Sequence, residues 1–84
     1  MRVISQDGTI DIPYELTSIQ LVSKTTIIAQ GSYFGSSSDD NYVTVAEYST
    51  EEKAKKSIEM LHDEWNDYGQ VGLFQFPKDE DVEV

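Results

Sequence analysis

Apolar and polar residues alternate with a period of two in several short stretches of the chain, and half-buried β-strands require this period. The clearest stretch is residues 42–48, where Val43 and Val45 share one face and Ala46 falls on the opposite face. Five further β-prone stretches lie at residues 2–5, 9–12, 18–23, 26–30 and 71–76. The pattern therefore predicts five to six short strands.

Turn-forming residues separate these stretches. Asp7-Gly8 favours the positive φ of a tight hairpin turn between the first two strands. Pro13 has no N–H to donate, so we expect it to end the second strand or to lie at a sheet edge. Lys24-Thr25 is expected to form the next turn, and residues 35–41 contain only turn-forming residues and predict an exposed, mobile loop.

A single helix is predicted after the strand at residues 42–48. Ser49 and Glu52 match a capping box, in which the serine hydroxyl accepts from the Glu52 N–H and the carboxylate accepts from the Ser49 N–H. Gly69 stands where a helix commonly ends, so the helix is expected over residues 50–68. Its apolar stripe, which should face the sheet, consists of Ala54, Ile58, Leu61, Trp65 and Tyr68.

These elements predict an α+β fold, in which a small antiparallel sheet packs against one helix in the C-terminal half of the chain. Residues 1–77 are expected to form one domain, since 84 residues cannot support two cores, and residues 78–84 to form a frayed acidic tail. The uncovered sheet face, or an edge strand, is a predicted site of homo-oligomer formation. Aromatic side chains expected on that face are Tyr14, Tyr42, Tyr48, and Phe74 or Phe76.

Composition excludes several kinds of chemistry. The chain has no Cys and one His, so disulfides, thiolate nucleophiles and Cys-based metal sites are excluded. No catalytic constellation is recognisable, and we expect no enzymatic activity, no cofactor and no metal. The formal net charge of −10 repels phosphate backbones and anionic lipids, which argues against nucleic-acid and membrane binding and for a basic protein partner. No apolar run approaches the length of a signal or membrane segment, so a cytoplasmic location is expected.

The acidic residues are unevenly placed. Residues 46–84 carry eleven acids against four lysines. Asp63, Glu64 and Asp67 crowd the C-terminal end of the predicted helix, where the macrodipole favours cations, and Asp63 repels Asp67 four residues away. Stability does not explain this arrangement, so these acids are candidates for binding. The alternative is a solvated face that keeps an acidic protein soluble.

Two groups of residues are candidates for contact with a protein partner. The acidic group lies on the helix and in the tail and comprises Glu59, Asp63, Glu64, Asp67, Asp79, Glu80 and Asp81. The second group lies in or beside the predicted loop, where aromatic and acidic side chains often contribute to recognition, and comprises Tyr33, Phe34, Asp39 and Asp40.

Residues 1–15 (MRVISQDGTIDIPYE) and 48–61 (YSTEEKAKKSIEML) resemble small uncharacterised proteins of prophages and other mobile elements of Gram-positive bacteria. The resemblance implies a setting in which small acidic proteins bind and block a host protein, and it transfers no catalytic residue. Our leading hypothesis is a non-enzymatic phage-type inhibitor of a host defence or nucleic-acid-binding protein that acts as a DNA mimic.

Two other hypotheses stay open. One is a homo-oligomeric sponge for a small nucleotide-like ligand, with aromatic pockets at subunit interfaces and basic residues such as Arg2, Lys24 or Lys78. The other is a structural or assembly component of a virion.

Overall fold

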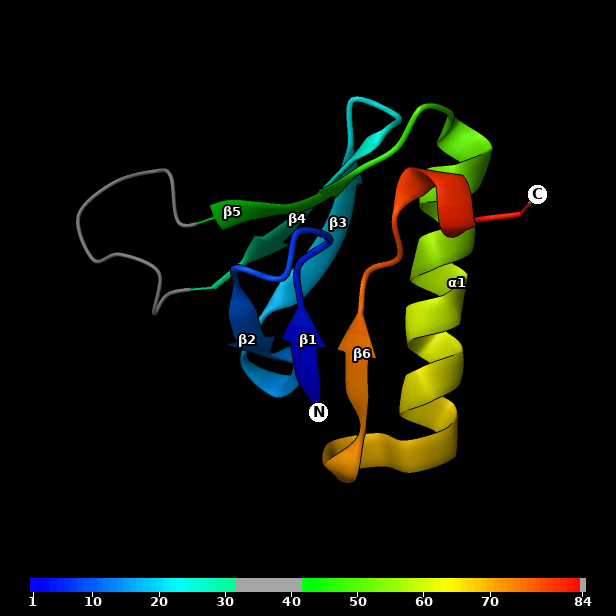
Figure 1. Ribbon diagram of the computed structural model, residues 1–84. Helices are drawn as coiled ribbons and strands as arrows, with labels where there is room; N and C mark the ends of the chain where they lie inside the picture. The colour runs from blue at the N-terminus through cyan, green and yellow to red at the C-terminus, as the bar shows by residue number, and fades with distance from the viewer. Residues whose placement is uncertain (32–41, 84) are drawn as a thin grey trace.

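The structure is a computed structural model that describes residues 1–31 and 42–83. These residues form six strands and one α-helix, so the predicted α+β class is confirmed (Figure 1). The elements are, in chain order, β1 (Arg2–Ile4), β2 (Asp11–Pro13), β3 (Ser18–Val22), β4 (Thr26–Gln30), β5 (Tyr42–Glu47), α1 (Glu51–Tyr68) and β6 (Leu73–Gln75).

The strands are divided between two three-stranded sheets rather than gathered in one. The first sheet has the order β2-β1-β6 and the second has the order β3-β4-β5. All pairs are antiparallel except β1–β6, which is parallel. Because α1 runs down the molecule before β6 runs back up (Figure 1), the helical connection returns the chain beside β1 in the same direction. A pattern of strands read along the sequence does not reveal this long-range pairing.

The opening hairpin follows the prediction. Gly8 has φ +80°, the left-handed conformation that the tight turn between β1 and β2 requires. Pro13 is the last residue of β2, which is an edge strand of the first sheet, so its missing N–H leaves no ladder bond unmade.

Strand β5 departs from strict alternation at a β-bulge. Ile27 pairs with Ala46 but the next residue, Ile28, pairs with Thr44, so Val45 has no partner of its own on β4. Val45 and Ala46 are consequently both buried, at 2% and 3% exposure, although simple alternation places them on opposite faces. The bulge is a local insertion that the period of two cannot predict.

The helix occupies the predicted range, but its N-cap lies one residue later than predicted. Thr50 is the N-cap, and its hydroxyl accepts a hydrogen bond from the Lys53 N–H at 3.2 Å. The predicted capping box of Ser49 and Glu52 is therefore wrong, because the Ser49 N–H donates instead to Asp79 Oδ1 at 2.7 Å. Gly69 ends the helix with φ +58°, as its position predicts.

The core lies between the helix and the two sheets. Ala54 and Leu61 are fully buried on the predicted stripe, and Trp65 packs on Tyr14 with ring centroids 5.2 Å apart. Tyr68 is an exception with 59% exposure. The backbone of Gly72 passes close to the Cβ of Tyr68, since a Cβ on Gly72 would lie 3.2 Å from it.

Most aromatic side chains predicted for an uncovered sheet face belong to the core. Tyr48, Phe74 and Phe76 are buried, and the Tyr48 hydroxyl donates to the Pro77 carbonyl at 2.7 Å. Burial raises the pKa of Tyr48. Tyr42 is 44% exposed and Tyr14 is half-buried against Trp65, so these aromatic side chains do not gather on one uncovered face. Self-association, through a sheet face or an edge strand, stays a prediction.

The C-terminal segment is docked rather than frayed. A 3₁₀ turn at Asp79–Asp81 lies beside the upper half of α1 (Figure 1). Val82 is 4% exposed and belongs to the hydrophobic core, while Lys53 Nζ donates to the Asp79 carbonyl at 2.9 Å. One apolar residue among the acids therefore anchors the segment, a contact that composition alone does not predict.

Candidate protein-interaction surface

Three of the predicted acids form a line on the solvent face of α1. Glu59, Asp63 and Asp67 are exposed and follow one another at intervals of four residues, ~6 Å along the axis. Glu59 and Asp63 lie on the side of the helix away from the buried Leu61, because a displacement of two residues turns the helix through ~200°. Asp67, six residues from Leu61, lies ~120° around the helix from it. We call these three residues the acidic line. The helical spacing predicts this arrangement, and the structure retains it.

Lys and Arg residues of this chain leave most of the acidic line unpaired. Lys56 Nζ lies 3.9 Å from Glu59 Oε2, an exposed pair that contributes little. Within residues 1–31 and 42–83, neither Asp63 nor Asp67 has a cation within ion-pair distance. The sequence explains this, since residues 57–77 contain neither Lys nor Arg.

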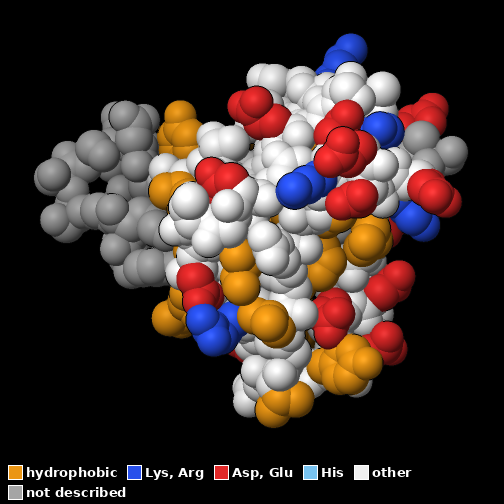
Figure 2. All heavy atoms as spheres, viewed as in Figure 1, with side chains coloured by type: hydrophobic (Ala, Val, Ile, Leu, Met, Phe, Trp, Pro, Cys, Tyr) orange, Lys and Arg blue, Asp and Glu red, His pale blue; other side chains and the backbone are white. Residues whose placement is uncertain are grey.

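The lysines gather at the opposite end of the helix. Lys53 and Lys55 lie in its first turns and pair with Asp79 at 3.5 Å and Glu51 at 3.9 Å. Figure 2 shows basic side chains mainly over the upper part of the molecule, intermixed with acids, whereas the lower part has acids among hydrophobic side chains. Arg2 lies on β1 beside Leu73 of β6 and forms an ion pair with Asp11 of β2. The charge of α1 is therefore polarised along its length.

The predicted acids of the C-terminal segment do not join the acidic line. Asp79 contacts Lys53, which is ten residues, or ~15 Å along the axis, from Asp63. The Ser49 N–H and Lys53 lower the pKa of Asp79, in that order of importance. Asp79 is therefore a structural group, and Glu80 and Asp81 lie beside it. The seven predicted acids form two surfaces rather than one.

Sequence reasoning missed a group of exposed apolar side chains next to the acidic line. Tyr68, Val71 and Leu73 are 59%, 89% and 54% exposed and occupy the connection from α1 to β6. Alternation in β6 places Phe74 inside and Leu73 outside. The sequence held one signal for the exposure of Tyr68, namely its position in the last turn of the helix. The last turn can extend beyond the strands that cover the rest of the apolar stripe.

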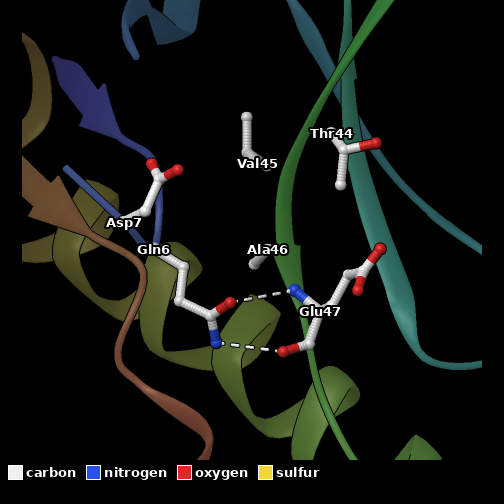
Figure 3. Close-up of a pocket in the computed structure, with 6 residues that line it drawn as sticks. All are labelled: Gln6, Asp7, Thr44, Val45, Ala46 and Glu47. Carbon is white, nitrogen blue, oxygen red and sulfur yellow. Dashed lines mark hydrogen bonds between the residues drawn. The ribbon is translucent and has the colours of Figure 1, made fainter. Parts of the chain in front are cut away.

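The hollow drawn in Figure 3 is small and polar. Residues 6–7 and 44–47 line it, and the Gln6 side chain spans from the first sheet to the backbone of β5. Within the described residues, no group of three His, Asp or Glu side chains is placed to hold a metal ion.

The second predicted group of site residues lies outside the described residues, and so does the predicted loop at 35–41. That group consists of Tyr33, Phe34, Asp39 and Asp40.

Comparison of the chain with protein-family models, with curated protein sequences and with solved structures finds no match. Among the described residues, no helix combines the length and the apolar character that crossing a membrane requires.

Proposed function

We propose that the chain is a non-enzymatic binding protein that attaches to a basic surface of another protein through the acidic line of α1. The observation that carries the proposal is the exposure of Asp63 and Asp67 in a stretch of the chain, residues 57–77, that contains no Lys or Arg. Among the described residues, no cation neutralises them, so their potential reaches solvent.

Fold stability gives no reason for this arrangement. Asp63 and Asp67 repel each other at i,i+4 spacing and oppose the helix dipole, which together cost a few tenths of a kcal/mol or more. Selection for stability alone favours lysine at such positions. A row of carboxylates ~6 Å apart also presents negative charge in a line, as a nucleic-acid backbone does. This supports a DNA mimic that occupies the basic groove of a nucleic-acid-binding protein.

The biological setting of the proposal comes from the sequence resemblance. Residues 1–15 and 48–61 resemble small proteins of prophages and mobile elements, among which blocking a host protein is a common mode of action. We therefore propose that the basic partner is a host protein and that binding inhibits it.

Neither rival hypothesis gains a specific observation. A sponge for a small anionic ligand needs basic residues beside an apolar pocket. Arg2 is paired with Asp11, and Lys24 lies in the turn between β3 and β4. Lys78 does line a described open hollow, but four carboxylates line it too and oppose an anionic ligand: Asp7, Glu47, Asp79 and Glu80.

Affinity capture with matched variants tests the proposal. The tagged wild-type protein, Asp63→Lys with Asp67→Lys, and Glu80→Lys with Glu83→Lys are each incubated with a lysate of a Gram-positive bacterium. Each double substitution changes the formal net charge from −10 to −6, so the variants differ only in where the charge changes.

The proposal expects a basic protein that the wild type and the Glu80/Glu83 variant retain and that the Asp63/Asp67 variant loses. Raising the salt concentration should release it, because exposed charges are screened over ~8 Å at physiological ionic strength. Equal retention by all three proteins would contradict the proposal, and equal loss from both variants would show that only the net charge matters.

A further inference from the structure

The C-terminal end of α1 combines two kinds of surface that are seldom placed together without a ligand. Glu64 and Asp67 supply negative charge, and Tyr68, Val71 and Leu73 supply exposed apolar area. We call these five residues the helix-end surface. Figure 2 shows hydrophobic and acidic side chains side by side over the lower part of the molecule.

Four of the five residues lie at the end of α1 and in the turn that follows it, and Leu73 begins β6 with its side chain on the outer face of the sheet, beside Arg2. Glu64 and Tyr68 lie one helical turn apart, so their side chains adjoin on the helix surface. Tyr68 Cβ lies directly over the buried Gly72, which separates Val71 from Leu73. The apolar side chains therefore surround one reversal of the chain, and acidic side chains border them on the helix.

Packing within the chain does not account for these apolar side chains. Val71 is 89% exposed and Leu73 54% exposed, so neither gains much from burial in the folded chain. An apolar patch bordered by charged residues is typical of a protein-interaction site.

We infer that the helix-end surface binds a basic amphipathic segment of a protein, whose apolar side chains cover Tyr68, Val71 and Leu73 while its Lys or Arg residues meet Glu64 and Asp67. This inference rests on the proposed function and adds the kind of partner segment that the site accepts. Charge complementarity selects the occupant: among the described residues, Glu64 and Asp67 form no ion pair, and the nearby Arg2, which lies beside Leu73, is already paired with Asp11.

A second copy of the chain fits this surface poorly. A two-fold dimer places the same patch of each copy face to face, so Glu64 and Asp67 of one copy would meet those of the other. Arg2, the neighbour of Leu73 across β1 and β6, is already paired with Asp11, and residues 57–77 contain neither Lys nor Arg. Like charges brought together in this way oppose association.

Fluorescence anisotropy with two synthetic peptides tests the inference. The first is an 18-residue helical peptide with leucines at i, i+3, i+4 and i+7 spacing and lysines elsewhere, and the second carries serine in place of every leucine. Both are titrated with the wild type, with Val71→Ser plus Leu73→Ser, with Asp63→Lys plus Asp67→Lys, and with Tyr42→Ser. The last variant removes an exposed apolar side chain from the other sheet and is the matched control.

We expect the lysine–leucine peptide to bind the wild type and Tyr42→Ser equally and to bind the Val71/Leu73 variant about tenfold more weakly, the factor that ~1.4 kcal/mol produces. The lysine–serine peptide should bind these three proteins alike.

The inference is overturned if the Val71→Ser plus Leu73→Ser variant binds both peptides as the wild type does. The proposed function fails only if the Asp63/Asp67 variant also keeps wild-type affinity. Sedimentation in the absence of peptide gives a further check: a wild-type dimer that the Val71/Leu73 variant abolishes would assign the surface to a second copy and overturn the inference.

Discussion

The side-chain amide of Gln6 pairs with the backbone of Glu47 as a neighbouring strand would. Gln6 Oε1 accepts from the Glu47 N–H at 3.1 Å, and Gln6 Nε2 donates to the Glu47 carbonyl at 3.0 Å (Figure 3). The Gln6 backbone N–H donates to the Val45 carbonyl at 2.7 Å, on the bulged part of β5. One residue therefore joins the first sheet to the free edge of the second.

Replacing Gln6 by Ala should destabilise the protein by about 1–3 kcal/mol, because the substitution removes the bonds to Glu47 and a further bond from Nε2 to the Pro77 carbonyl at 3.2 Å. Gln6→Glu should also destabilise, since it places a carboxylate against two carbonyl oxygens. Urea unfolding followed by circular dichroism measures both effects. Wild-type midpoints for both variants would show that the two sheets do not depend on this contact.

Thr50→Ala should cost about 1 kcal/mol, because the Lys53 N–H loses its acceptor at the start of α1. Ser49→Ala is the control and should have a smaller effect, since the Ser49 contact to Asp79 uses the backbone N–H. Thermal unfolding of the two variants distinguishes the caps. A larger loss for Ser49→Ala would restore the capping box that the sequence predicts.

Asp7 should make stability depend on pH in acid. Hydrogen bonds, first from the Ser5 hydroxyl and then from Thr9, lower the pKa of Asp7 from 3.8 to about 2. A carboxylate whose pKa falls on folding contributes stability that is complete above the unfolded pKa and is lost as the pH falls through the folded pKa. The contribution should therefore disappear between about pH 4 and pH 2.

The variant Asp7→Asn isolates this effect because it cannot titrate. Urea unfolding of the wild type and of Asp7→Asn at pH 5, 4, 3 and 2 should give a difference in stability that shrinks as the pH falls. A difference that stays constant over this range would show that the folded protein does not hold Asp7 ionised.

The C-terminal segment should contribute to the stability of the fold. Val82→Ala removes a side chain that is 4% exposed and should destabilise by about 1–3 kcal/mol. Glu83→Ala alters the exposed neighbour and should change stability by less than about 0.5 kcal/mol. Denaturation curves that superimpose for Val82→Ala and the wild type would mean that the segment is frayed in solution.

The sequence predicts those parts of the fold that depend on residues close together in the chain. The helix range and the hairpin at Gly8 depend on residues that are close in the chain, and both predictions are confirmed. The errors involve partners far apart in sequence: Gln6 lies 41 residues from Glu47, and Ser49 lies 30 residues from Asp79. Periodicity carries no information about such pairs, so the two sheets, the helix cap and the docked end could not be predicted.

In the candidate site, too, features set by neighbouring residues could be predicted and features set by distant residues could not. The acidic line of Glu59, Asp63 and Asp67 depends only on helical spacing, and the structure keeps it on one exposed face. Asp79 lies apart from the acidic line, because tertiary folding brings it to Lys53. Leu73 is exposed because Phe74, on the other face of β6, points into the core. The sequence of β6 alone does not indicate which of its two faces is buried.

Helix α1 presents unneutralised charge at its C-terminal end and not along its whole length. This distribution can be measured by titrating the isotopically labelled protein with octalysine and recording ¹H–¹⁵N correlation spectra at low salt. We expect shifts concentrated at Asp63, Glu64 and Asp67, with loss of these shifts in Asp63→Lys plus Asp67→Lys and a preserved fold in that variant. Shifts spread evenly over the exposed acids, or centred on Glu51 and Glu52, would contradict it.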